Sequence, residues 1–363
     1  MSLVRVTADR LDAGYSRTCF LVESYKNMPY KYLVSLAVAA VLVTAATTGA
    51  AQARDSIDAY SSRSFVAYRY FFAGLHPAAK PVNPKPVVRL GSSVSLYERT
   101  VRQSTLRRQG CKAGRRNLSG VVILDFGKLA SNGHSYGTIL FSGRFAGNRA
   151  ITRALLAFAV GYHRCLPMGS HARISLARGT SNYRPGVPSA FSAGRKWARE
   201  VSTLSHWLYY RNLDVHVWSA AADDAEPAWD PRFRETRDFF RGYRHTGIGK
   251  PLYNYGSLDG GIGVYWTAAQ AFYVSGGMRY SRAIPEIYNR AMAREWAELA
   301  RVVHVRFHSR VRFAGVMTQG KSTCHCSLRG RVAHRVLSSY LRARVGSAAP
   351  DLPHVLTNIR SDF

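Results

Sequence analysis

Acidic residues are scarce in this 363-residue chain. Its 21 aspartates and glutamates stand against 51 lysines and arginines, which gives a formal net charge of +30 at pH 7. A charge of this size attracts anionic polymers such as acidic glycans, cell-wall polymers, nucleic acid or lipid headgroups. The basic residues are spread along the whole chain, so a general arginine bias without a binding role fits equally well. No recognisable nucleic-acid-binding motif accompanies the charge, and we do not expect nucleic acid to be the partner.

Cysteine is also in short supply. Cys19 lies near the N-terminus, and the other four are Cys111, Cys165, Cys324 and Cys326. An even number in an exported protein is compatible with two disulfides, in one of three pairings. The last two cysteines flank a histidine, but no second ligand pair stands at zinc-site spacing. We therefore expect disulfides or free thiols, and neither a metal nor another cofactor.

Long apolar runs are missing except near the N-terminus. Residues 32–50 are apolar or small, Lys31 precedes them, and the sequence Ala-Gln-Ala follows at 51–53. This arrangement predicts a secretory signal peptide cleaved after the Ala-Gln-Ala sequence, with Met28 as the true start. An uncleaved signal anchor is the alternative, because the run is nearly long enough to span a bilayer. We expect residues 1–53 to be a leader, the mature chain to be secreted, and no membrane span to remain after cleavage.

Regular periodicity is weak between the leader and residue 119. Residues 76–88 contain four prolines, which exclude a helix and favour extended backbone. We predict that residues 54–118 form a basic N-terminal extension and that residues 119–363 form the folded domain.

Strand and helix patterns alternate from residue 121 onwards. Predicted helices at 148–162, 191–210, 230–244, 291–303 and 331–345 separate most of eight predicted strands, at 121–127, 171–179, 215–222, 251–256, 272–275, 284–289, 311–319 and 355–360. This order predicts an α/β fold, an irregular (β/α)8 TIM barrel with an N-terminal extension. A doubly wound open sheet is the alternative, disfavoured because no glycine-rich phosphate loop follows the first strand.

Polar residues cluster where the predicted strands end. The candidate substrate-binding residues are Asp125, Tyr253, Tyr255, Glu286, Gln319 and the neighbouring Trp229, and the candidate catalytic residues are Asp224 and Glu226. Carboxyl ends of barrel strands carry the active site, and an i, i+2 pair on extended backbone points to one face. Two carboxylates in one pocket are the minimum equipment for acid/base work on a glycosidic bond. The alternative is a loop whose acids cap a helix or pair with arginines.

Several motifs resemble a group of exported bacterial proteins with a glycoside-hydrolase-like barrel. They include Asp-Ala-Glu-Pro-Ala-Trp at 224–229 and Tyr-Asn-Tyr-Gly-Ser at 253–257, and the resemblance covers roughly residues 120–363. A more distant similarity to family 25 glycoside hydrolases, the barrel muramidases, implies that Glu226 is the proton donor and Asp224 its partner. This sequence departs from that family in the spacing of its early strands and in the proline after Glu226.

Two functions therefore remain open. The first is an exported hydrolase that acts on a polymeric glycan, such as a cell-wall polymer, by carboxylate acid/base chemistry. The second is a non-catalytic module of the same shape that binds carbohydrate or an anionic cell-wall polymer.

Overall fold

The computed structural model describes residues 91–184, 186–319 and 327–360. Contacts divide the chain into units 1–85 and 86–363, and all described residues belong to the second. The predicted leader, the proline-rich connector and Cys324 and Cys326 lie outside the described residues. Within the described ranges, no helix combines the length and apolar character needed to cross a bilayer.

A parallel sheet organises the described chain. Its strands are β1 (Gly91–Tyr97), β2 (Gly120–Ser131), β5 (Ile174–Ser181), β6 (Val217–Asp224), β7 (Leu252–Asn254), β8 (Ser281–Ala283), β9 (Val316–Gln319) and β10 (Val355–Arg360). They lie in the order β8-β7-β6-β5-β2-β1-β10-β9, and every neighbouring pair is parallel. The expected α/β fold with parallel strands is thereby confirmed.

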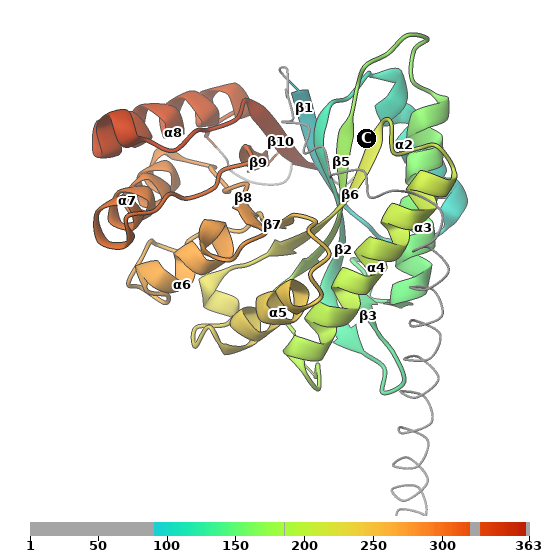
Figure 1. Cartoon of the computed structure of the whole chain (residues 1–363), viewed down its shortest axis with the longest axis horizontal. Helices are drawn as coiled ribbons and strands as arrows, with labels where there is room; N and C mark the ends of the chain where they lie inside the picture. Colours follow the sequence, from blue (N-terminus) through green and yellow to red (C-terminus); the bar gives the residue numbers. More distant parts are fainter. Residues whose placement is uncertain (1–90, 185, 320–326, 361–363) are drawn as a thin grey trace, which may run out of the picture. The chain divides into compact units, whose positions relative to one another are not determined.

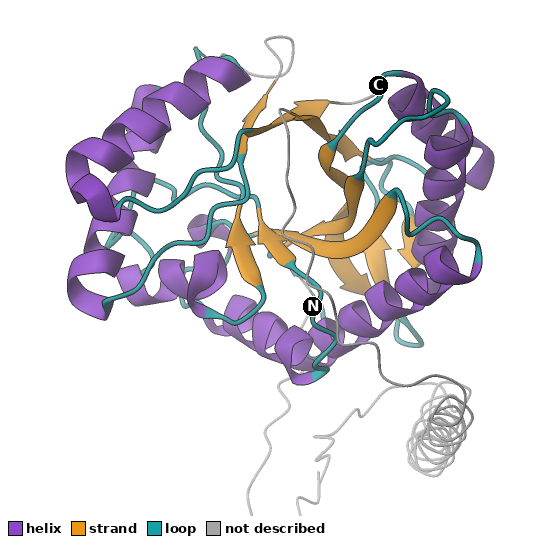
Figure 2. Ribbon diagram, turned by 45° about the horizontal axis from the view of Figure 1, so that its top comes forward, coloured by secondary structure: helices purple, strands orange, loops and turns teal. Residues whose placement is uncertain are grey.

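The sheet curls into an incomplete barrel (Figure 2). Strand β1 pairs with both β2 and β10, so the first and last strands are neighbours. The edge strands are β8 and β9, which share no ladder. Two isolated parallel bridges, Ala283 to Phe313 and Glu286 to Met317, connect the segments at these edges.

Helices follow the strands and pack outside the curled sheet (Figure 1). They are α2 (Gln103–Arg115), α3 (Asn148–Arg164), α4 (Ala190–Tyr210), α5 (Arg234–His245), α6 (Ala268–Phe272), α7 (Arg290–Phe307) and α8 (Gly330–Val345), with the short helices η1 (Pro227–Trp229), η2 (Tyr273–Gly277) and η3 (Gly346–Ala348). Helix α6 begins with a capping box, in which Thr267 and Gln270 exchange reciprocal hydrogen bonds. A disulfide between Cys111 and Cys165 joins α2 to the end of α3.

Strand β2 continues beyond the sheet into a hairpin. Its end pairs antiparallel with β3 (Tyr136–Ile139), which pairs with β4 (Phe145–Gly147). The β2–β5 register shifts after Asp125, and Gly127 adopts a positive φ of 80°. A Cβ at Gly127 would lie 2.4 Å from the Ile139 carbonyl oxygen, so glycine is required at this bend.

Side chains alternate along each strand between the inside of the curled sheet and the side that faces the helices, and each side has its own apolar core. Val121 and Ile123 of β2, with Ala220 and Ala222 of β6, pack inside the curl. The intervening residues of the same strands face the helices, as Val122 and Leu124 do. Strands buried on both faces explain the continuous apolar runs in the sequence.

Three expectations about the elements differ from the structure. Residues 272–275, expected as a strand, are helical within α6 and η2, and the strand in this region is β8. Phe272 stacks on Phe307 of α7, so the apolar run packs between helices, and periodicity cannot distinguish this from a short buried strand. Residues 284–289 make an isolated bridge rather than a strand, and the predicted strand 311–319 shortens to β9.

The sheet also begins earlier than expected. Residues 91–118, placed in the N-terminal extension by sequence, include β1 and α2. Strand β1 lies between β2 and β10 and therefore belongs to the folded unit. Its sequence Gly-Ser-Ser-Val-Ser-Leu-Tyr contains three serines, which hid a strand that is buried on both faces.

Candidate functional site

The side-chain alternation of two strands brings acids to the inner mouth of the curled sheet. Asp125 has the same orientation as Val121 and Ile123, and Asp224 has that of Ala220 and Ala222. Both acids lie near the carboxyl ends of their strands, where sites form in parallel α/β sheets. The two expected site residues therefore face the interior for the same reason.

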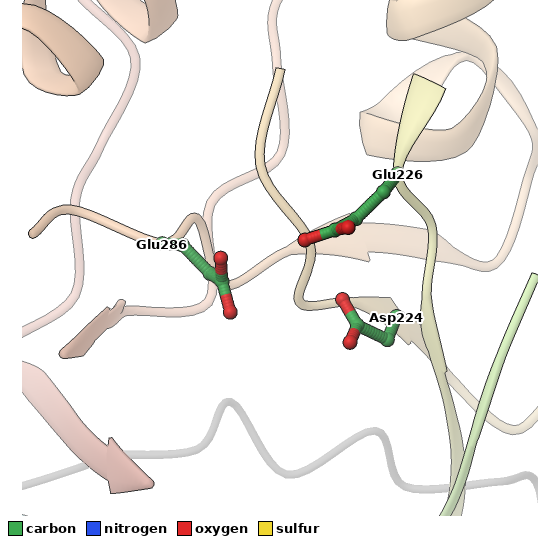
Figure 3. Close-up of side chains that lie close together, drawn as sticks. All are labelled: Asp224, Glu226 and Glu286. Carbon is green, nitrogen blue, oxygen red and sulfur yellow. The ribbon is translucent and has the colours of Figure 1, made fainter. Parts of the chain in front are cut away.

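Three carboxylates converge at this mouth. Oxygen atoms of Asp224, Glu226 and Glu286 all lie within 4.8 Å of one another (Figure 3). Glu226 has extended backbone, with φ of −101° and ψ of 129°, so the i, i+2 pair shares one face as expected. Glu286 approaches from the segment after β8. It is 5% exposed, whereas Asp224 and Glu226 are half-buried.

The loop after β7 fits closely against the loop that carries Asp224 and Glu226. A Cβ at Gly256 would lie 2.7 Å from the carbonyl oxygen of Ala225, the residue between the two acids. The Gly256 N–H donates to the Asn254 side chain at 3.1 Å. Glycine in the Tyr-Asn-Tyr-Gly-Ser motif therefore allows this close approach.

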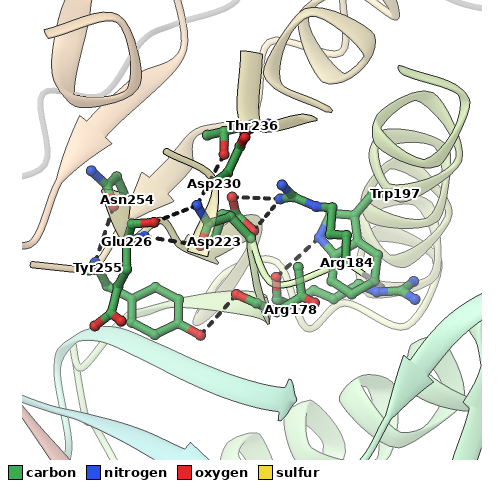
Figure 4. A network of polar contacts seen from close by, with 12 residues as sticks. Arg178, Arg184, Trp197, Asp223, Glu226, Asp230, Thr236, Asn254 and Tyr255 are labelled. Atoms are coloured by element: carbon green, nitrogen blue, oxygen red, sulfur yellow. Dashed lines mark hydrogen bonds and ion pairs between the residues drawn. The ribbon is translucent and has the colours of Figure 1, made fainter. Parts of the chain in front are cut away.

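Asn182 fixes the backbone of Glu226. Its side-chain amide donates to the Glu226 carbonyl oxygen at 2.8 Å, and its Oδ1 accepts from the Glu226 N–H at 3.1 Å. The same amide reaches the Thr236 hydroxyl at 3.0 Å (Figure 4). Hydrogen bonds thus connect the loop after β5 to the loop after β6 at the backbone of Glu226.

Arg184 neutralises Asp223, the acid that precedes Asp224 in the sequence, and not a member of the carboxylate cluster. Asp223 alternates to the helix side, where Arg184 donates to both carboxylate oxygens at 2.7 Å, and both side chains are fully buried (Figure 4). Arg184 also lies 4.2 Å from the centre of the Phe239 ring. Within the described residues, Asp224, Glu226 and Glu286 form no ion pair with arginine or lysine.

Burial without a cation raises the pKa of every acid in the cluster. Burial raises the pKa of Glu226 to about 7, with a further contribution from Asp259. Burial also raises the pKa of Glu286 to about 8, opposed by a hydrogen bond from Tyr288 and assisted by Glu226. The pKa of Asp224 rises well above its ordinary value, through burial first and then repulsion from Glu286 and Glu226. The cluster therefore retains protons at neutral pH.

Asp125 of β2 is a fourth buried acid at this mouth, and its charge contributes to the raised pKa of Asp224. Burial raises the pKa of Asp125 to about 6, while a 2.8 Å hydrogen bond from the Gly127 N–H lowers it. Its Cα partner across the β1–β2 ladder is Tyr97. Burial, followed by Asp224 and Asp125, raises the pKa of Tyr97, so this phenol stays protonated.

Two further tyrosines contact the acids. Tyr288 donates to Glu286 Oε1 at 2.5 Å, and burial followed by Glu286 raises the Tyr288 pKa. Tyr255 is fully buried and donates to the Thr180 carbonyl oxygen at 3.2 Å. Its pKa is raised by burial and then by Asp125. These hydroxyls stay protonated next to the carboxylates.

Among the described residues, the remaining expected site residues form no hydrogen bond with the three carboxylates. Tyr253 points into the interior, and its hydroxyl donates to Ser175 near the start of β5 at 3.1 Å. Gln319 ends β9 and is half-buried. Trp229 is 41% exposed in η1, with its ring 6.4 Å from that of Tyr183. Trp266, an aromatic residue of a neighbouring loop, packs in the core, where its indole N–H donates to the Asp230 carbonyl oxygen at 2.8 Å.

Sequence reasoning missed Tyr97, Asn182 and Tyr288 as site residues. Asn182 follows the predicted strand 171–179, and Tyr288 lies in the predicted strand 284–289, so their position near strand ends was a usable signal. Tyr97 carried no such signal, because its strand was assigned to the extension.

The three converging carboxylates are also the group whose spacing would allow a shared metal ion. Among the described residues, Asp224, Glu226 and Glu286 form a cluster of three acids close enough for this. Hard cations such as Ca²⁺ and Mg²⁺ take oxygen ligands of this kind. The expectation of no metal remains a prediction.

No protein-family model matches the sequence, and no curated protein matches it. Among solved structures, one match is a candidate mandelate racemase/muconate lactonizing enzyme from Labrenzia alexandrii, with a TM-score of 0.39 and 13% sequence identity. It covers 75% of this chain and 56% of that chain, so this chain spans little more than half of that protein. A likeness this distant bears on neither substrate nor mechanism.

Proposed function

We propose that this chain is an exported glycoside hydrolase with an irregular (β/α)8 barrel, acting on a polymeric glycan such as a cell-wall polymer. The observation that carries the proposal is the convergence of Asp224, Glu226 and Glu286, without a paired cation, at the carboxyl ends of parallel strands. The two isolated bridges between the β8 edge and the β9 edge of the sheet support the barrel as the finer description of the fold. The predicted leader supports export.

Glu226 is the proton donor in this proposal. A pKa of about 7 keeps a large fraction protonated near neutral pH, which suits a general acid. It donates its proton to the glycosidic oxygen as the bond from that oxygen to the anomeric carbon breaks. Water then adds to the anomeric carbon and returns a proton to Glu226, so the acid is regenerated.

Asp224 is the partner of Glu226. Its Oδ1 is buried and has no hydrogen-bond partner among the described residues, so it is free to bind a sugar hydroxyl. In its ionised form Asp224 can also stabilise charge on the sugar ring. Carboxylates about 5–5.5 Å apart are typical of retaining glycosidases, and about 6.5–9.5 Å of inverting ones. In this cluster one oxygen atom of each acid lies within 4.8 Å of the others, which favours retention. Retention requires ionised Asp224 to hold the glycosyl intermediate on one face, while water adds from the face that the leaving group vacated.

The test is the release of reducing ends from peptidoglycan and from acidic polysaccharides. Wild type is compared with Glu226→Gln, which keeps shape but cannot donate the carboxyl proton. Glu235→Gln is the matched control, because Glu235 is exposed in the first turn of α5. Equal rates in wild type and Glu226→Gln would remove Glu226 from the mechanism, and loss of activity in EDTA would assign the three carboxylates to a metal instead.

A non-catalytic carbohydrate-binding module is the second candidate. It is supported by the exposed Trp229 and Tyr183 rings and by Lys128, whose Nζ lies 5.4 Å from the centre of the Tyr183 ring. Exposed aromatic rings suit apolar sugar faces, and the lysine suits an anionic polymer. This function predicts salt-sensitive binding to cell walls with no turnover and no effect of Glu226→Gln.

A further inference from the structure

A groove of about 310 Å³ lies between helices α2, α3 and α4, in the outer helical layer. The acid cluster lies instead at the inner mouth of the curled sheet. Each of the three helices contributes one arginine to the groove: Arg107 from α2, Arg153 from α3 and Arg211 just after α4. The groove is therefore a second concave surface, chemically opposite to the first.

The three arginines have no ionic partners among the residues that the structure describes. Within the described ranges, Arg107, Arg153 and Arg211 make no ion pair and no side-chain hydrogen bond, and no acidic residue lines the groove. All three are exposed. Guanidinium groups that converge without an anion repel one another, and phosphate relieves this repulsion through charge-assisted hydrogen bonds.

Besides the arginines and Gln103, the lining of the groove is apolar. Leu156 and Val160 of α3 are only partly buried and belong to its lining, and Trp207 of α4 contributes an aromatic ring. Tyr210, three residues after Trp207 in the same helix, is 62% exposed. Arginines beside partly buried aliphatic and aromatic side chains suit a ligand with an anionic head and an apolar chain.

Two of the groove walls are held rigidly together. A Cβ at Gly110 would lie 2.0 Å from the Phe158 carbonyl oxygen, and one at Gly161 would lie 2.0 Å from the Arg107 carbonyl oxygen. The helices α2 and α3 thus meet backbone to backbone, and the Cys111–Cys165 disulfide links them at one end. A preformed wall of this kind lowers the entropy lost on binding.

We propose that this groove binds a phosphate-bearing amphiphile, with the phosphate on Arg107, Arg153 and Arg211 and the acyl chain along Leu156, Val160 and Trp207. The site is independent of the glycan chemistry proposed above. An exported protein that holds such a ligand would work at a surface that contains anionic lipid.

The probe is dihexanoyl phosphatidic acid, kept below its micelle-forming concentration and titrated calorimetrically into the full-chain protein. The triple variant Arg107→Gln/Arg153→Gln/Arg211→Gln should bind it at least roughly tenfold more weakly, because each basic residue contributes to attraction by anionic lipid. Trp207→Gln, which keeps all three charges, should also weaken binding, and it remains informative if the triple variant does not fold.

The matched control removes the same charge elsewhere. Arg306, Arg335 and Arg342 are exposed on α7 and α8, and their triple replacement by glutamine should leave binding unchanged. An equal loss of phosphatidic acid binding in both triple variants would show that only the overall charge matters. That result would overturn the proposed site.

Two further ligands separate the alternatives. Inorganic phosphate should bind more weakly than the lipid, and dihexanoyl phosphatidylcholine should bind more weakly than phosphatidic acid. If inorganic phosphate binds as tightly as the lipid, the apolar chain contributes nothing, and the proposal of an amphiphilic ligand is overturned. A short DNA duplex that binds more tightly than the lipid, and loses this binding in the groove triple variant, would assign the groove to nucleic acid instead.

Discussion

Replacing Glu286 by glutamine should stabilise the protein at alkaline pH and leave its stability near pH 5 almost unchanged. In the folded chain, burial is the main reason that the pKa of Glu286 rises from 4.5 to about 8. The folded state therefore binds this proton more tightly than the unfolded state. The stabilisation is fully present below pH 4.5 and is lost as the pH rises through about 8.

The magnitude follows from the size of the pKa change. One pKa unit corresponds to about 1.4 kcal/mol, so Glu286 alone removes about 4 kcal/mol from the free energy of unfolding between pH 4.5 and pH 8. Glutamine has nearly the same shape and still accepts the hydrogen bond from Tyr288. The variant should therefore lose the penalty without losing the contact.

The assay is urea unfolding of wild type and Glu286→Gln at pH 5 and at pH 8. The chain carries a formal charge of +30, so general repulsion also changes with pH, and the difference between the two proteins cancels this effect. We expect Glu286→Gln to be more stable by about 4 kcal/mol at pH 8 and within about 1 kcal/mol of wild type at pH 5. The exposed Glu235→Gln variant should show no such change. An equal stability difference at both pH values would refute the conclusion that Glu286 is a buried carboxyl group without a compensating cation.

Three other predictions concern a buried ion pair, the disulfide and the exposed Trp229. Asp223→Ala leaves the buried Arg184 without its carboxylate and should lower the free energy of unfolding by about 3–5 kcal/mol, measured in urea; a loss below about 1 kcal/mol would contradict a buried pair. Cys111→Ser opens the bond to Cys165, which spans 54 positions, and should cost about 2–4 kcal/mol in the same assay, whereas unchanged stability would show that the bond does not form. Trp229→Ala should raise KM for a polymeric glycan roughly three- to tenfold with kcat unchanged, and an unaltered KM would remove its ring from the binding surface.

Much of the acid site could be predicted because strand alternation is local. A continuous apolar run that ends in Asp125, and another that ends in Asp224, indicate strands that are buried on both faces. The carboxyl ends of parallel strands then place these acids at one rim. The convergence of Glu286 with Asp224 and Glu226 follows from the same rule, even though its segment forms no full strand.

The arrangement around the first expected strand could not be predicted. Strand β1 carries three serines in seven residues, so its pattern lacks the apolar signal of its neighbours. Tyr97 therefore went unrecognised, although it is the ladder partner of Asp125. The helical segment at 272–275 was missed because aromatic residues favour strands locally, and tertiary packing decides between the two.

The sequence also could not show which acid the arginines neutralise. Asp223 and Asp224 are adjacent, and a register shift of one residue would exchange their environments. In the structure, Asp223 receives Arg184 on the helix side, and Asp224 faces Glu286 without a cation. The high arginine content therefore coexists with an acid cluster whose pKa values are raised.

The pH dependence of reducing-end release from peptidoglycan tests the role of Glu226 most directly. The rate of the wild type should fall above about pH 7, as Glu226 loses the proton it must donate. Glu226→Gln should be at least roughly a hundredfold slower across the range and should lack this alkaline decline. Turnover by Glu226→Gln at the wild-type rate, or salt-sensitive binding to cell walls by wild type without turnover, would contradict a catalytic Glu226.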